Sequence, residues 1–254
     1  MVPMSRWIPE AATELDVCLA EAILEGGGPI LRDADRRPAR DARWIVGLLG
    51  LRGLRVTEND VLAVLEQRPG RFRPEHVEAA WIRGFRRAID AIDRAADFGR
   101  LPTHQTVQEL IEALRDSGSC VRNLPRTDLP WDVVEGVDYA PADRVAEMLD
   151  QFSVESAWRQ VHGTVEGGPS HPVRSAAAVC RAFVELSPFV DFNVPIACLV
   201  ASQVLESSGY PTFLVHAGDR GTLREVIKEP LPIYEHWFAE VVLASWHALR
   251  RSAA

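Results

Sequence analysis

The chain has 254 residues, of which 47% are hydrophobic and 25% charged, the composition of an ordinary globular protein. Its net charge of −8 provides no basic stripe, so we expect no nucleic-acid partner. No run of about 18 uncharged apolar residues occurs and the N-terminus lacks a secretory pattern, so we expect a cytoplasmic protein without a membrane partner. The four cysteines are scattered without a Cys-x-x-Cys pair, which predicts free thiols and no metal site, and we expect no cofactor.

Helix signals dominate the first half of the chain. Apolar residues at helical spacing predict helices at Ala11–Leu24, between Thr57 and Pro69, at Pro74–Phe98 and at Thr103–Leu114. Thr57 followed by Asp60 has the spacing of an N-terminal cap. We expect a mainly α protein in which a helical N-terminal extension, residues 1–100, packs on a core of residues 101–254.

The most informative stretch runs from His171 to Pro211. It predicts two helices, His171–Leu186 and Pro195–Ser208, joined by a loop that contains the only polar cluster expected to line a pocket, namely Ser187, Asp191 and Asn193. Its fixed features are His171-Pro172-Val173, Ala176-Ala177, Phe183, Leu186-Ser187-Pro188-Phe189-Val190-Asp191-Phe192-Asn193-Val194-Pro195 and Gly209-Tyr210-Pro211.

This stretch resembles, without a gap, the core pattern of the Fic family, whose members transfer AMP from ATP to protein hydroxyls. The family has His-Pro, an Ala-Ala pair, Phe, then Ile-His-Pro-Phe-x-Asp-Gly-Asn-Gly-Arg-x-x-Arg and a later Gly-Tyr-Pro. The reactive positions differ here. Ser187 stands for the catalytic His, Phe192 and Val194 for two glycines, and Pro195 and Cys198 for two arginines, while Asp191 and Asn193 match.

These departures predict that AMP transfer has been lost. An unassisted serine hydroxyl cannot replace imidazole as a general base near neutral pH. Phosphates need backbone N–H groups at a glycine-rich helix start, where Phe192 and Val194 add bulk and Pro195 removes an N–H donor. The absence of both arginines further predicts weak nucleotide binding.

The resemblance extends upstream of this stretch. Residues 74–114 resemble the family's long helix, Leu-Pro-Thr turn and following helix, and Gly118–Arg122 resembles its Gly-x-aromatic-Arg element. The resemblance implies a short β-hairpin flap between Asn123 and Gly136, although Pro125, Pro130 and Trp131 interrupt a regular hairpin. Glu21 to Gly26 resembles the family's inhibitory helix motif, and an ordinary helix end explains Glu25-Gly26 equally well.

The candidate site residues are Asp191 and Ser187 for catalysis, and Phe192, Asn193, Pro195, Cys198 and His171 for ligand contact. Each has a structural alternative. Asp191 or Asn193 before Pro195 would cap a helix, and His171 before Pro172 suits a helix start. Cys198, one helical turn past Pro195, is expected to face the former phosphate pocket.

Two functions remain open. In the first, a Fic-like protein that has lost AMP transfer binds a peptide, a partner or a small ligand in the remodelled cleft. In the second, the cleft belongs to a repurposed enzyme of a bacterial biosynthetic pathway that acts on a small molecule, with Asp191 as acid or base.

Overall fold

The computed structural model describes residues 8–24, 37–73, 75–115, 125–163, 171–216 and 218–251. All the helices in these ranges are α-helices: α1 (Glu10–Leu24), α2 (Arg37–Leu51), α3 (Glu58–Leu65), α4 (Val77–Asp97), α5 (His104–Arg115), α6 (Val145–Asp150), α7 (Val154–His162), α8 (Pro172–Leu186), α9 (Asn193–Ser207), α10 (Asp219–Val226) and α11 (Leu231–Arg251). A single bridge, Thr103 to Ser153, is the only β pairing among the described residues. The expected mainly α fold is confirmed.

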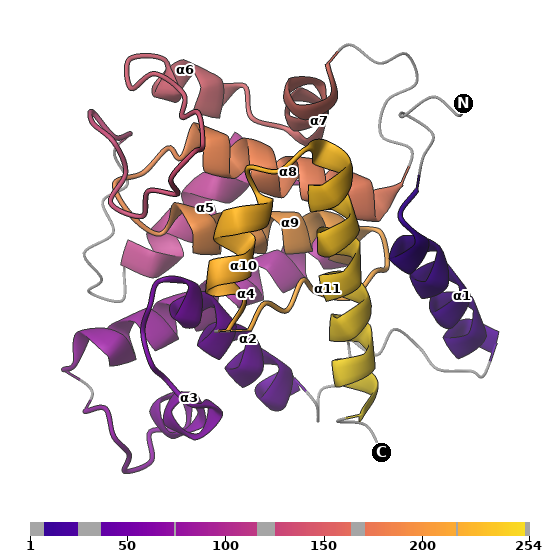
Figure 1. Cartoon of the computed structure of the whole chain (residues 1–254). Helices are drawn as coiled ribbons and strands as arrows, with labels where there is room; N and C mark the ends of the chain where they lie inside the picture. Colours follow the sequence, from indigo (N-terminus) through magenta and orange to yellow (C-terminus); the bar gives the residue numbers. More distant parts are fainter. Residues whose placement is uncertain are drawn as a thin grey trace.

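The core is built around α8 and α9, which pack against each other and are joined by residues 187–192. In Figure 1 this pair crosses the middle of the molecule, with α4 and α5 behind it and α11 in front. Fourteen residues of α9, Asn193 to Glu206, are buried. A helix buried on every side belongs to the centre of a domain. No helix in the described ranges is long and apolar enough to cross a membrane.

The N-terminal helices pack on this centre. α1 lies against α11, at the side of the molecule in Figure 1, and α2 contacts α3, α4 and α9. Gly47 of α2 approaches the backbone of Val215 so closely that a Cβ added to it would meet the carbonyl oxygen. Only glycine permits this contact between α2 and the segment that follows α9.

Local signals place several helix ends. Thr57 begins α3 with a capping box in which its side chain accepts the Asp60 N–H and Asp60 accepts the Thr57 N–H, as the spacing predicts. His171 begins α8 by accepting the Val173 N–H at 3.2 Å, with Pro172 in the first helical position.

The segment expected as a flap has no strand within its described part. Residues 125–136 form turns, bends and irregular backbone, consistent with interruption by Pro125, Pro130 and Trp131. The expected features at Glu25-Gly26, Gly118–Arg122 and Asn123 lie outside the described residues.

A buried ionic cluster joins α2, α4 and α9. Arg40 of α2 donates to Asp93 of α4 at 2.8 Å and to its neighbour Asp41. Glu206, near the end of α9, accepts a hydrogen bond from Thr212. Burial, opposed by Arg40 and assisted by Asp93, raises the pKa of Glu206 to about 7. The cluster therefore contains a carboxyl group that titrates near neutrality.

Candidate functional site

The loop between α8 and α9 begins at Ser187, which ends α8 in the left-handed conformation with φ of 37°. Its hydroxyl donates to the carbonyl of Val184 at 2.6 Å, and the side chain is buried. The hydroxyl is directed back at the helix that it terminates. Ser187 thus serves the turn, and does not line the cavity described below.

At the far end of the loop, α9 starts in an unusual way. Phe192 occupies the N-cap position with φ of 65° and makes no side-chain capping bond. Asp191 accepts the N–H of Phe192 at 2.8 Å, and Asn193 accepts the N–H of Phe189 at 2.9 Å. Neither bond is made to a backbone N–H in the first turn of α9. The capping role that the sequence offers as an alternative for Asp191 and Asn193 is therefore not seen for either side chain.

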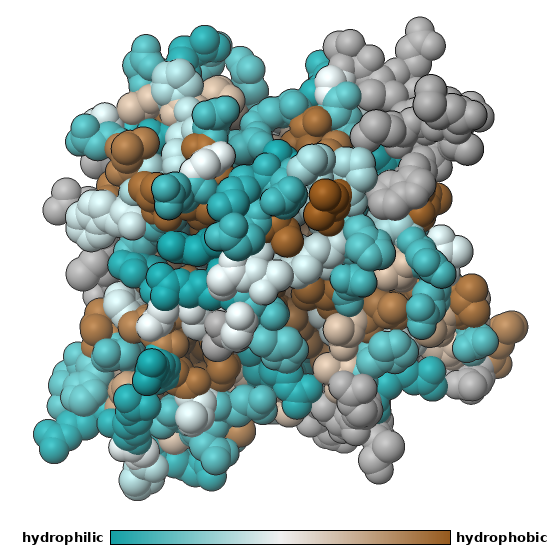
Figure 2. Space-filling model, in the orientation of Figure 1, coloured by the Kyte–Doolittle hydropathy of each residue, from teal (hydrophilic) through white to brown (hydrophobic). Residues whose placement is uncertain are grey.

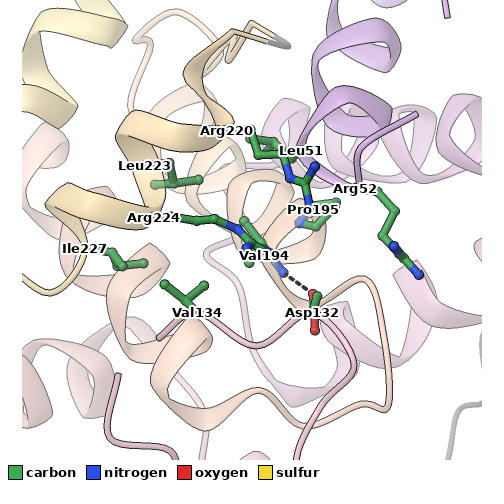
Figure 3. Close-up of a pocket in the computed structure, with 10 residues that line it drawn as sticks. All are labelled: Leu51, Arg52, Asp132, Val134, Val194, Pro195, Arg220, Leu223, Arg224 and Ile227. Carbon is green, nitrogen blue, oxygen red and sulfur yellow. Dashed lines mark hydrogen bonds between the residues drawn. The ribbon is translucent and has the colours of Figure 1, made fainter. Parts of the chain in front are cut away.

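The cap comes instead from Asp132, which is distant in sequence. One oxygen of its carboxylate accepts the Val194 N–H at 3.2 Å, and the other accepts the side-chain amide of Asn193 at 2.9 Å. Figure 3 shows the bond to Val194. Burial raises the pKa of Asp132, an effect that these two hydrogen bonds oppose. A helix N-terminus favours anions through its free N–H groups and its dipole, and here a side chain of the same protein occupies that position.

Arg126 holds the segment that carries Asp132. Its buried guanidinium donates to the carbonyls of Ser187 at 2.7 Å, Asp128 at 2.9 Å and Ala140 at 2.6 Å. Its backbone N–H donates to Pro188. A cation bonded to the last carbonyls of a helix complements the negative end of the dipole. Arg126 thereby fastens residues 125–140 to the end of α8.

A small cavity of about 10 Å³ lies at the start of α9, with room for about one water molecule. Its lining combines α2, the 132–134 segment, α9 and α10: Leu51, Arg52, Asp132, Val134, Val194, Pro195, Arg220, Leu223, Arg224 and Ile227. In Figure 3 Arg224 extends from α10 towards Val194, and Arg220 lies beside Leu51 and Pro195. Three arginines and Asp132 therefore line the cavity at the first turn of α9.

Asp191 is paired with one of these arginines. Arg52 donates to one carboxylate oxygen of Asp191 through Nε at 3.0 Å and Nη2 at 2.8 Å. The side chain of Arg52 is about one-third exposed, whereas that of Asp191 is largely buried. With the additional bond from the Phe192 N–H, the Asp191 side chain accepts three hydrogen bonds, which position the loop.

The other residues expected in the cleft separate into two groups. Val194 and Pro195 line the small cavity. Phe192 instead turns into the core, where its ring lies 5.4 Å from that of Trp81 and 6.0 Å from that of Phe85. The bulk at position 192 is used for packing against α4 rather than for shaping a pocket.

His171 is remote from this loop. It begins α8 whereas Ser187 ends it, and a helix of 15 residues separates its two ends by about 22 Å. The Nε2 of His171 lies 3.2 Å from the carboxylate of Asp16 of α1, which also accepts the hydroxyl of Tyr210 at 2.5 Å. His171 therefore ties α1 to α8 and shares no site with Asp191.

Cys198 faces α8 and not the cavity. It is fully buried, and its hydrogen bond with Cys180 together with burial raises the pKa of the Cys198 thiol well above its ordinary value. A protonated, enclosed thiol has no nucleophilic role. Among the described residues no cluster of three or more His, Cys, Asp or Glu side chains is arranged to hold a metal ion.

This chain is similar to known proteins in structure but not detectably in sequence. No family profile matches the chain, and no curated protein matches its sequence. A Fic-domain-containing signaling protein from Bacteroides thetaiotaomicron has a TM-score of 0.69 at 14% identity, with 94% of this chain and 96% of that chain covered. The chain has the Fic fold.

Two further solved structures agree. A Fic family protein from Desulfovibrio desulfuricans has a TM-score of 0.66 at 16% identity, covering 98% of this chain and 76% of that one. A fragment of Fic-1 from C. elegans has a TM-score of 0.65 at 16% identity, covering 96% and 72%. The similarity spans nearly all of this Fic-fold protein, including the N-terminal helices.

The sequence pattern does not single out Asp132 or Arg126 of this Fic-fold protein, nor Arg52, Arg220 and Arg224. Its one usable signal is the run from Leu129 to Val134, in which Asp132 is the only charged residue among apolar ones. An acid inside an apolar run predicts a buried partner. Which donor it meets depends on the tertiary fold.

Proposed function

We propose that this Fic-fold protein has lost AMP transfer and binds a peptide or protein partner through the segment 125–136. One observation carries the proposal. The carboxylate of Asp132 occupies the N-terminus of α9, where an anion would otherwise accept the Val194 N–H.

A triphosphate in that position would have to displace Asp132. It would also bring negative charge beside a buried carboxylate, which costs energy unless that group is protonated. The cavity that remains holds about 10 Å³. These features support the loss of nucleotide binding.

The hydroxyl of Ser187 supports the same conclusion for the chemical step. It already donates to Val184, and serine lacks a pKa suited to a general base. Ser187 therefore does not replace the imidazole that the resemblance implies.

The segment 125–136 provides a surface for a partner. Residues 129–134 alternate, with Leu129, Trp131 and Val133 exposed and Pro130, Asp132 and Val134 buried. The side chain of Trp131 is 73% exposed. Its backbone N–H donates to Val190 at 2.7 Å, which holds the segment in place. An exposed Trp side chain on an anchored backbone, beside other exposed apolar side chains, is typical of a protein-binding surface. On the face shown in Figure 2, apolar side chains interrupt an otherwise hydrophilic surface.

Two measurements test the proposal. Calorimetry with ATP and magnesium, together with labelling by radioactive ATP, should show neither binding nor AMP transfer. Selection of a displayed peptide library on the protein should yield peptides whose binding is lost in Trp131→Ser. The matched control is Phe98→Ser, which removes an equally exposed aromatic side chain at the end of α4. Robust AMP labelling, or peptides insensitive to Trp131, would refute it.

A second candidate function, an enzyme acting on a small molecule, is favoured by the raised pKa of Asp132. Asp191 is less suited to proton transfer because Arg52 and the Phe192 N–H hold its carboxylate. In that case Asp132→Asn would abolish turnover of the small molecule while Asp191→Asn would reduce it less. We further propose a cytoplasmic location, in which Cys180 and Cys198 remain reduced.

A further inference from the structure

A larger cavity lies away from the α8–α9 loop. It holds about 620 Å³ and is formed by the last turn of α3, the turn at residues 67–73 and the first turns of α4. In Figure 1 these elements are at the lower left of the view. This volume is within the range of small-molecule sites, whereas the cavity at α9 has room for about one water molecule.

The walls of this cavity are mainly apolar. Ala63, Val64 and Leu65 of α3 form one side, Phe72 closes the turn, and the buried Ala79 of α4 lies on the opposite side. Arg71 stands over the ring of Phe72 at 5.1 Å and fixes this aromatic wall. The cavity therefore offers mainly apolar contacts to a ligand.

Its charged groups all have one sign. Arg68, Arg73 and Arg83 line the cavity, and none of the described residues that line it is acidic. Glu66 pairs with Arg68 at 2.5 Å and offsets part of this charge from outside the lining. The stretch 66–87 contains six arginines and three glutamates in a chain whose net charge is −8. A ligand that fits this charge pattern carries a negative group.

The backbone at Gln67 adds a separate observation. Gln67 follows α3 with φ of 54°, and the Arg68 N–H donates to Ala63 while the Gln67 N–H donates to Val64. This is a Schellman ending, in which the left-handed position is usually glycine. A glutamine there is strained relative to glycine, yet Gln67 is one of the polar residues that line the cavity. Strain of this kind concentrates at binding sites.

We propose that this cavity binds a small organic anion with an apolar body, an aromatic carboxylate or sulfonate. The apolar body fills the space between α3 and α4. The arginine side chains and the amide of Gln67 hold the acidic group at the rim.

The proposal is tested with two dyes of the same shape. 8-Anilinonaphthalene-1-sulfonate has an aromatic body and a sulfonate, and N-phenyl-1-naphthylamine has the same body without the charge. Fluorescence titration of the folded protein should show the anionic dye binding about tenfold more tightly, as expected for a charge-assisted contact. Equal affinities would overturn the proposal.

Variants locate the site. Arg73→Glu should weaken binding of the anionic dye about tenfold and leave the neutral dye unchanged, whereas Arg144→Glu on the exposed α6 should change neither. Gln67→Gly should weaken binding of the anionic dye about three- to tenfold without lowering the thermal midpoint of the protein. Trp131→Ser should leave both dyes bound. An unchanged affinity in Arg73→Glu, or loss of binding in Trp131→Ser, would place the dye elsewhere.

Discussion

The carboxylate of Asp132 accepts the backbone N–H of Val194 at 3.2 Å, across 62 positions of sequence. The helix that forms the centre of the core therefore takes its N-terminal cap from a surface segment. One contact both completes α9 and fills its anion-binding end, so the stability of the fold and the exclusion of phosphate are coupled.

Removal of this cap should destabilise the protein. Asp132→Ala is expected to lower the free energy of unfolding by about 1–2 kcal/mol, the usual effect of losing a helix cap. For a chain of this size the thermal midpoint should fall by about 2–8 °C. Asp128→Ala, an exposed acid of the same segment, is the control and should shift it by less. Equal midpoints for the two variants in a thermal scan would contradict the capping role.

The ionic cluster at α9 should make stability depend on pH. The pKa of Glu206 is raised from 4.5 to about 7, so the native state binds the proton more tightly than the unfolded chain. Its contribution is thus fully present below about pH 4.5 and is lost as the pH rises through about 7.

Glu206→Gln removes this titration and keeps a side-chain oxygen that can accept the Thr212 hydroxyl. The variant should match the parent protein near pH 5 and exceed its stability at pH 8, by on the order of 2–3 kcal/mol. Urea unfolding at both values measures the difference. Glu155→Gln on the exposed face of α7 should leave the pH profile unchanged. A Glu206→Gln profile parallel to that of the parent would show that this carboxyl group does not titrate in the range.

Arg126 should be the main anchor of the 125–140 segment. Arg126→Met leaves the carbonyls of Ser187 and Ala140 without their donor, which should cost about 2–4 kcal/mol. The segment should also become accessible, so limited proteolysis should cut it faster at fixed temperature. Arg144→Met, which breaks only the exposed pair with Glu147, is the control. Uniform cleavage rates in the two variants would remove the anchoring role.

The sequence predicts helices well where the signal is local. The Thr57 and Asp60 spacing places the start of α3, and His171-Pro172 places the start of α8, because each cap joins residues within one helical turn. The ungapped resemblance of residues 171–211 to the Fic pattern predicts the fold as well as the helices.

The site is less predictable because its contacts are distant in sequence. Asp191 pairs with Arg52 across 139 positions, and this partner determines that the carboxylate positions the loop. Cys198 and His171 are expected from the sequence to contact a ligand in the cleft, but their observed neighbours are Cys180 and Asp16, which are also distant in sequence. Spacing gives the helical position of Cys198, but which neighbour that face meets depends on how α8 packs.

Two non-glycine residues with positive φ flank the loop, and they should respond differently to glycine. Phe192→Gly removes the strain of a left-handed backbone, which is about 1 kcal/mol. It also deletes a buried ring packed on Trp81, which costs about 3–5 kcal/mol of stability. We expect a net loss of about 2–4 kcal/mol.

Ser187→Gly relieves similar strain at φ of 37° and loses only the hydroxyl bond to Val184, worth about 0.5–1.5 kcal/mol. Its net effect should lie within about 1 kcal/mol of zero, because the two terms nearly cancel. Denaturant unfolding of both variants separates the cases. If Phe192→Gly is as stable as Ser187→Gly, the ring contributes little to the core. A glycine at position 192 would then be tolerated, and the packing of Phe192 would not explain why the loop lacks one there.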